Sequence, residues 1–197
     1  MRQRVTNLAI LLVLALGQVV AVRAQEIPSE EEIGVVEVLQ SDEAALAAIF
    51  PDADSAQAGT VAIDSVMRGV LRSRLGRIVR DSAYTYYDVF ANGLRVGTAI
   101  IAEEQGKYRP ITFMAGVDTS WRVADVRVLV YRESRGGEVR HTRFLKQYRG
   151  KSLENPIRIN RDIVNITGAT ISVNALNAGV RKVLAVVEYM HAGGGAK

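Results

Sequence analysis

The chain has 197 residues, 48% of them hydrophobic and 23% charged, with a formal net charge of +4. This length suits one domain with its own hydrophobic core rather than two. The sequence has no cysteine and only two histidines, His141 and His191. Disulfides, iron–sulfur clusters, c-type haem and a thiol nucleophile are therefore excluded, and neither a zinc site nor a histidine-based triad is expected.

The first 24 residues have the features of a secretory signal peptide. Arg2 and Arg4 precede an apolar stretch over residues 8–22, and small or modest side chains occupy the positions that a signal peptidase reads. We expect cleavage after Ala24 and a mature protein in the periplasm or another extracytoplasmic compartment. The alternative is an uncleaved N-terminal anchor, although the apolar stretch is shorter than the roughly 20 residues of a membrane span.

The positive charge belongs mainly to this leader. Its three arginines have no acidic neighbours, and without them the chain has 22 Lys and Arg against 21 Asp and Glu, a net charge of +1. Such a balance does not favour nucleic-acid binding, and we expect no nucleic-acid partner.

Residues 25–82 are predicted to form an N-terminal arm followed by helices. The arm is acidic and ends near Ser41. A short helix is expected over residues 43–50, a loop over the small and polar residues 52–59, and a surface helix over residues 61–75, where apolar residues recur at helical spacing.

The pattern changes to β at residue 83. Asn92-Gly93 stands between two runs rich in β-branched and aromatic residues and is a strong hairpin signal. A helix ending at Gly150 and a long amphipathic C-terminal helix are expected to follow. The predicted strands cover residues 83–90, 94–103, 111–117 and 122–131, and the predicted helices cover 138–148 and 171–189.

These elements predict an α+β fold in which an antiparallel sheet is flanked by helices. The expected organisation is a signal peptide (1–24), the arm and helices (25–82), a single domain (83–191) and a flexible tail (192–197).

The segment most informative about chemistry lies just before the last helix. Thr167, Gly168, Ala169, Thr170 and Ser172 place hydroxyls and small residues at a helix N-terminus. Such a terminus presents unpaired N–H groups and a partial positive charge, which suit a phosphate group. The alternative is plain helix capping by one of the two threonines, which is common.

The sequence TGATIS at residues 167–172 resembles the attachment motif of FMN-binding domains in the sodium-pumping NADH:quinone reductase and in Rnf electron-transport complexes. The resemblance implies that Thr170 carries FMN through a phosphoester bond, with Thr167, Gly168 and Ala169 in the preceding motif positions. It also implies a partner, FAD:protein FMN transferase, which uses FAD and magnesium.

Three further segments resemble these domains in the same order: residues 46–52, 131–138 and 144–151. The second corresponds to the turn that precedes the acceptor loop, which implies that Glu133 and Gly136 line the flavin pocket. For Glu133 the alternative is a surface ion pair. One position departs from the family: Val164 stands six residues before Thr170, where an aspartate is usual.

The sequence thus predicts an extracytoplasmic electron-transfer flavoprotein that carries covalent FMN and works with a membrane redox complex or another electron donor or acceptor. No catalytic residue and no metal site of its own are predicted. Two alternatives stay open. One is a flavin-dependent reductase module. The other is an adaptor of a membrane redox complex that carries no flavin, which the substitution at Val164 allows.

Overall fold

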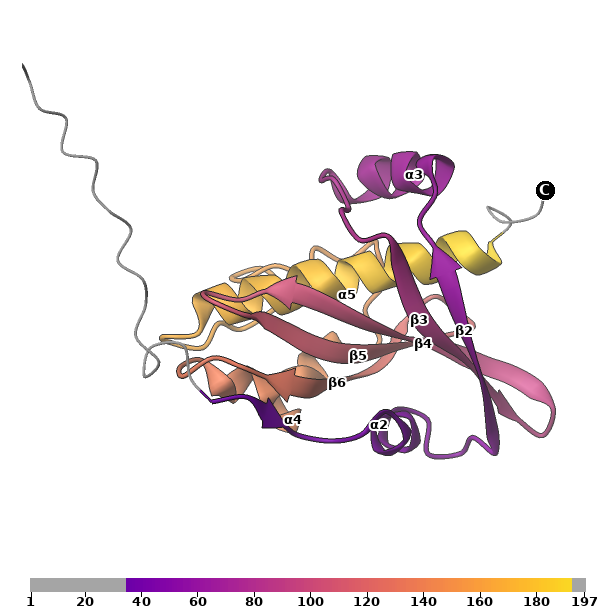
Figure 1. Cartoon of the computed structure of the whole chain (residues 1–197), viewed down its shortest axis with the longest axis horizontal. Coiled ribbons are helices and arrows are strands. Elements are labelled where there is room, and N and C mark those ends of the chain that lie inside the picture. Colours follow the sequence, from indigo (N-terminus) through magenta and orange to yellow (C-terminus); the bar gives the residue numbers. More distant parts are fainter. Residues whose placement is uncertain (1–34, 193–197) are drawn as a thin grey trace, which may run out of the picture.

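The computed structural model describes residues 35–192 (Figure 1). The predicted signal peptide, the arm up to residue 34 and residues 193–197 of the predicted tail lie outside the described residues. No helix among residues 35–192 is both long and apolar enough to cross a membrane.

A six-stranded antiparallel sheet in the order β1-β6-β5-β4-β3-β2 organises the domain, which confirms the predicted α+β class. The strands are β1 (Glu37–Val38), β2 (Ser55–Ala62), β3 (Ala83–Ala91), β4 (Leu94–Gln105), β5 (Pro110–Asp118) and β6 (Val123–Tyr131). The helical elements are α2 (Asp42–Ile49), α3 (Ser65–Leu75), η1 (Gly137–Arg140), α4 (Thr142–Leu145), η2 (Lys146–Tyr148) and α5 (Thr170–His191).

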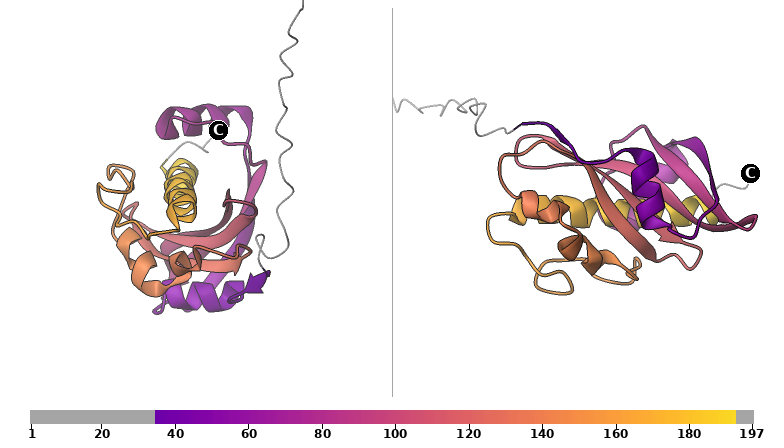
Figure 2. Two further views of the ribbon diagram at one scale, coloured as in Figure 1. Left: turned by 90° about the vertical axis from the view of Figure 1, so that its left-hand side faces the viewer. Right: turned by 90° about the horizontal axis from the view of Figure 1, so that it is seen from below.

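Helices cover both faces of the sheet (Figure 2). The long helix α5 lies along one face and α3 packs beside it, whereas α2 covers the other face. The alternation of side chains along β5 serves both layers, because Phe113 and Ala115 join the core under α5 and Met114 joins the core over α2. At Gly179 an added Cβ would lie 2.4 Å from the Phe113 ring, so this glycine lets α5 approach the sheet closely.

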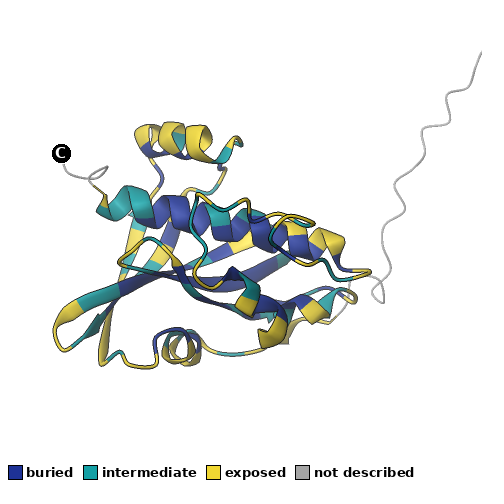
Figure 3. Ribbon diagram, turned by 180° about the vertical axis from the view of Figure 1, so that it is seen from behind, coloured by how far each residue is buried: buried dark blue, intermediate teal, exposed yellow. Residues whose placement is uncertain are grey.

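The helix α5 is buried for most of its length; its exposed positions lie near the N-terminus, and its C-terminal turn is half-buried (Figure 3). Leu176, Val180, Val183 and Val187 are all at most 1% exposed. This burial confirms the predicted apolar face and gives the N-terminus of α5 a rigid support.

The prediction of a loop over residues 52–59 was wrong, because β2 pairs along its whole length with β3, from Ser55 against Phe90 to Ala62 against Ala83. Small residues such as these have weak strand preference, and the exposed edge of β3 rather than local propensity decides their conformation.

Two predicted helices differ from those observed. The helix expected from residue 61 begins at Ser65, because Asp64 caps it by accepting the N–H of Met67 at 2.7 Å. The helix expected over 138–148 is three short pieces, η1, α4 and η2. The other predicted strands and helices are present within a few residues, and Asn92 and Gly93 form the hairpin turn with positive φ.

Candidate functional site

Thr170 is the first residue of α5, and its side chain is exposed. The residue at the N-cap is Ala169, and no side chain of the described part caps this helix. Alanine is a poor N-cap residue, so the first N–H groups of α5 keep their capacity to bind a ligand. The alternative of plain capping by Thr167 or Thr170 was therefore wrong.

The Thr170 hydroxyl has a defined neighbour. The side-chain amide of Asn165 donates a hydrogen bond to Thr170 Oγ1 at 3.0 Å. The loop that carries Asn165 is itself attached to η2, because the N–H of Val164 donates to Gln147 Oε1 at 2.8 Å. The acceptor loop and the segment over residues 144–151, which are separate motifs in the sequence, therefore form one unit.

Gly168 gives the loop its shape beside Thr170. Its φ of +83° lies in the left-handed region, and an added Cβ would meet nothing within 4 Å. The neighbouring Thr167 is exposed. The loop therefore leaves open space beside the Thr170 hydroxyl.

A hollow of about 500 Å³ lies next to Thr170, which is a volume typical of small-molecule sites. It is formed by the N-terminus of α5, by the turn after β6 and by the turn between β4 and β5. The lining residues are Lys107, Tyr108, Glu133, Ser134, Arg135, Gly168, Ala169, Thr170, Ile171 and Ser172. Five of the seven predicted site residues, Thr170 among them, thus line the hollow, whereas Thr167 and Gly136 line an adjoining hollow.

Glu133 forms the wall opposite α5 and is 9% exposed. Its carboxylate accepts the backbone N–H groups of Tyr108 at 2.7 Å and Arg109 at 3.0 Å. An added Cβ at Gly106 would lie 2.4 Å from Glu133 Oε1, so a glycine is needed for this contact. Glu133 therefore joins two turns of the wall, and the alternative of a surface ion pair was wrong.

Gly136 brings the turn after β6 against α5. Its φ is +77°, and an added Cβ would lie 2.9 Å from Ser172 Oγ. Tyr131 fastens the same turn, since its hydroxyl donates to the carbonyl of Arg135 at 2.6 Å and lies 3.3 Å from Ser172 Oγ. Burial raises the pKa of Tyr131 above its usual value, so the phenol is neutral and available as a donor.

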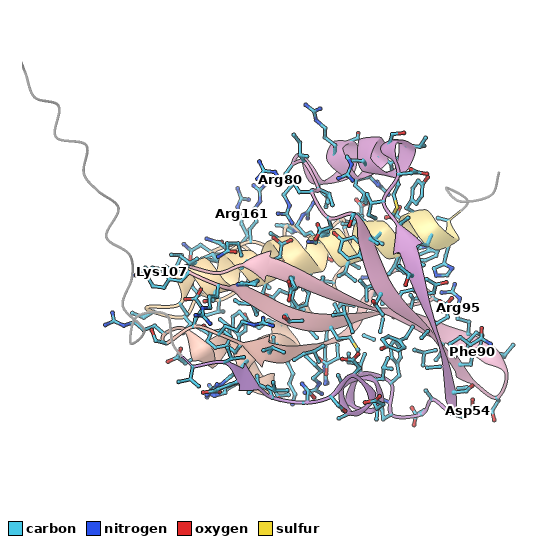
Figure 4. All side chains as sticks on the ribbon, in the orientation of Figure 1. Asp54, Arg80, Phe90, Arg95, Lys107 and Arg161 are labelled. Atoms are coloured by element: carbon cyan, nitrogen blue, oxygen red, sulfur yellow. The ribbon has the colours of Figure 1, made fainter. Side chains whose placement is uncertain are left out.

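The charge at the mouth of the hollow is positive. Lys107 and Arg135 are exposed, and Lys107 Nζ lies 4.4 Å from the centre of the Tyr108 ring. Figure 4 shows Lys107 at the end of the molecule where α5 begins. Together with the α5 N-terminus, these cations favour an anionic ligand.

The nearest carboxylate in the sequence, Asp162, is engaged elsewhere. It accepts the N–H groups of Ile157 and Arg158 and pairs with Lys151 at 3.1 Å. Val164, at the position where the resembling family has an aspartate, is 73% exposed. The side chain next to the Thr170 hydroxyl is thus the neutral amide of Asn165.

The tyrosines of β3 and the tryptophan do not line the hollow. Tyr84 is buried in the core, and neither it nor Tyr86 or Tyr87 lines the hollow. Trp121 stacks on His191 at the opposite end of α5, with ring centres 6.4 Å apart.

Three contributors were not identified from the sequence as site residues: Asn165, Gln147 and Lys107. Asn165 is the residue after Val164, and Gln147 lies within the segment over residues 144–151. Their proximity to the acceptor comes from loop geometry, and spacing along the chain gave no signal for it.

The comparison with protein families agrees with this geometry. The model of the FMN-binding domain matches residues 106–185, which include every residue lining the hollow. A search of curated proteins found no match.

Proposed function

Because the chain contains a member of the FMN-binding domain family, we propose that it is an extracytoplasmic electron-transfer flavoprotein whose FMN is joined by a phosphoester bond to Thr170. The observation that carries this proposal is the position of Thr170: an exposed hydroxyl at an uncapped helix N-terminus, facing a hollow of about 500 Å³. No other described hydroxyl of the motif combines these features, since Thr167 precedes the helix and Ser172 is buried.

The residues around Thr170 fit a flavin phosphate. The free N–H groups of α5 and the cations Lys107 and Arg135 suit the negative charge of a phosphodiester. Asn165 Oδ1 is buried and has no hydrogen-bond partner within residues 35–192, so it can accept a bond from a bound group. The open space at Gly168 admits a bulky group beside the loop.

When bound, FMN supplies reversible uptake and release of electrons. The residues of this chain hold and orient the group. Glu133 and Tyr131 fix the wall of the hollow, and Lys107 and Arg135 place positive charge at its mouth. The covalent bond retains the cofactor in a compartment where a dissociated flavin is lost by dilution.

The attachment reaction requires an external enzyme and FAD. Thr170 Oγ attacks the phosphorus of the FMN half of FAD, the P–O bond of the pyrophosphate breaks, AMP leaves, and the hydroxyl proton is released. The products are the phosphodiester on Thr170, AMP and one proton. The proposed partner is FAD:protein FMN transferase with magnesium, and the proposed electron donor or acceptor is a membrane redox complex.

A second candidate function follows from Val164. If a transferase needs the aspartate that this position lacks, the domain keeps its fold without flavin and acts as an adaptor of a membrane redox complex. Its exposed valine, 73% accessible, then serves as a contact surface rather than a recognition element.

Intact mass spectrometry distinguishes these functions. The full chain is expressed with a flavin transferase, beside Thr170→Val and the matched control Thr167→Val. We expect a mass increase of one FMN in the wild-type protein and in Thr167→Val, and none in Thr170→Val. Modification that persists in Thr170→Val contradicts the acceptor assignment, and an unmodified wild-type protein favours the adaptor. Cell fractionation of the same cultures tests the extracytoplasmic location.

A further inference from the structure

Asn165 is in contact with the proposed acceptor atom. Its Nδ2 donates to Thr170 Oγ1 at 3.0 Å, across a loop of five residues. A hydroxyl oxygen has two lone pairs and one proton. When Asn165 occupies one lone pair, the second lone pair and the proton of Thr170 share the two remaining directions around Oγ1.

The other half of the Asn165 amide has no structural use in the described part of the chain. Its Oδ1 is buried without a hydrogen-bond partner, a condition that costs stability. An apolar side chain of the same size avoids this cost. Tyr84, Arg127 and Asn177 also have an unpaired buried atom, but of these four side chains only Asn165 bonds to the proposed acceptor hydroxyl.

The position of Asn165 is set from a second element. Gln147 Oε1 accepts the N–H of Val164, and this bond attaches the loop to η2 beside the buried Phe144 and Tyr148. The ring centres of these two aromatic residues lie 5.9 Å apart in an edge-to-face arrangement. The Asn165 side chain therefore extends to Thr170 from a loop that is held in place by Gln147.

We propose that Asn165 is the positioning residue for flavin attachment: its amide orients the Thr170 hydroxyl for attack on FAD, in a loop whose Val164 supplies no carboxylate. This inference rests on the proposed function. Asn165 does not take part in bond making, and the hydroxyl proton leaves to the transferase or to water. The chain thus needs no aspartate at residue 164 to present its acceptor.

The test compares rates of FMN incorporation into the full chain by a purified transferase with FAD and magnesium, followed by intact mass. Asn165→Ala removes the contact, Asn165→Asp keeps the size of the side chain but replaces the N–H donor by a carboxylate oxygen, and Asn174→Ala replaces an exposed asparagine one turn into α5. We expect Asn165→Ala to react about tenfold more slowly, the factor that corresponds to one neutral hydrogen bond. We expect Asn165→Asp, which has the same size but no donor, to be slowed to a similar extent, and Asn174→Ala to match the wild-type rate.

A second readout does not depend on the transferase. In the protein without flavin, the NMR signals of the Asn165 side-chain amide are expected to shift on Thr170→Val and to stay unchanged on Thr167→Val. An unchanged signal in Thr170→Val overturns the contact.

The remaining outcomes separate this inference from the proposed function. Equal rates for Asn165→Ala and wild type overturn the inference alone, as does an Asn165→Asp variant that reacts at the wild-type rate. A wild-type chain that takes up no FMN from a transferase active on its own substrate overturns the covalent attachment itself, and the inference with it.

Discussion

The two ends of α5 are built in opposite ways. At the N-terminus, Thr170 is exposed, no described side chain caps the helix, and a hollow lies beside it. At the C-terminus, Trp121 stacks on His191, and His191 Nε2 lies 3.0 Å from Thr98 Oγ1 and 3.3 Å from Asp88 Oδ1. One helix thus has a closed end that fastens it to the β3–β4 hairpin and an open end that is free to bind a ligand.

The comparison indicates that the C-terminal end of α5 contributes to stability and that its N-terminal end serves ligand binding. At the closed end, the polar and aromatic side chains around His191 contact one another. The open end has N–H groups without a side-chain cap and one buried amide oxygen without a partner among residues 35–192, and that unpaired oxygen costs stability. Four substitutions test the contrast between the two ends.

Phe113→Ala removes the support that both ends share. Phe113 is 0% exposed, and its ring lies against Gly179 in the middle of α5. We expect a loss of about 3–5 kcal/mol in the free energy of unfolding, because a large cavity opens in the core. Urea unfolding measures it, with Val66→Ala at a 65% exposed position as the control. A loss below about 1 kcal/mol contradicts a core shared by both ends.

Glu133→Gln weakens the wall of the open end. The charged carboxylate accepts two backbone N–H groups, from Tyr108 and Arg109, and a neutral amide accepts them less strongly. We expect a loss of about 1–2 kcal/mol in unfolding free energy and faster hydrogen exchange at these two amides. Glu138→Gln, at an exposed position near the site, is the control. Equal exchange in the two variants contradicts the role of Glu133 as the link between the turns.

Trp121→Ala loosens the closed end alone. The stack on His191 is lost, and we expect a decrease of about 1 kcal/mol in unfolding free energy. Trp121 has a φ of +61°, which is unfavourable for a bulky residue, and alanine does not relieve this strain fully. FMN incorporation is expected to stay at the wild-type rate, and a slower rate shows that the two ends are coupled through α5.

The smallest effect is a dependence of stability on pH at the closed end. Burial, and then the positive charge of Arg95, lower the pKa of His191, while Asp88 acts in the opposite direction. In the unfolded chain the imidazole binds its proton at the ordinary pKa of about 6.5. Between that value and the lower folded pKa the unfolded state binds more protons, so stability decreases as the pH falls through this window.

The variant His191→Gln tests this dependence. Melting temperatures measured from pH 7.5 downward are expected to show a smaller decrease near pH 6 in His191→Gln than in the wild-type protein. Parallel curves for the two proteins contradict the lowered pKa. The change does not affect the open end, where no described histidine lies within the hollow beside Thr170.

Much of the fold was predictable because strong local signals agree with the tertiary structure. Asn92-Gly93 predicted its hairpin, and alternating β-branched residues predicted β6. The strand β2 was missed because its small residues have little preference of their own, and pairing with β3 decides their conformation. The single helix predicted over 138–148 was wrong for a related reason, since the turns between β6 and α5 are shaped by packing.

Local sequence signals are enough to predict the α+β class, the long apolar helix α5, the threonine at its start and the match to FMN-binding domains. The groups that meet this threonine are known only once the chain has folded. Glu133 reaches a turn about 25 residues away, and Gln147 holds the loop that places Asn165 beside Thr170. Such contacts depend on the direction of side chains and on loop conformation, and residue spacing along the chain does not encode either.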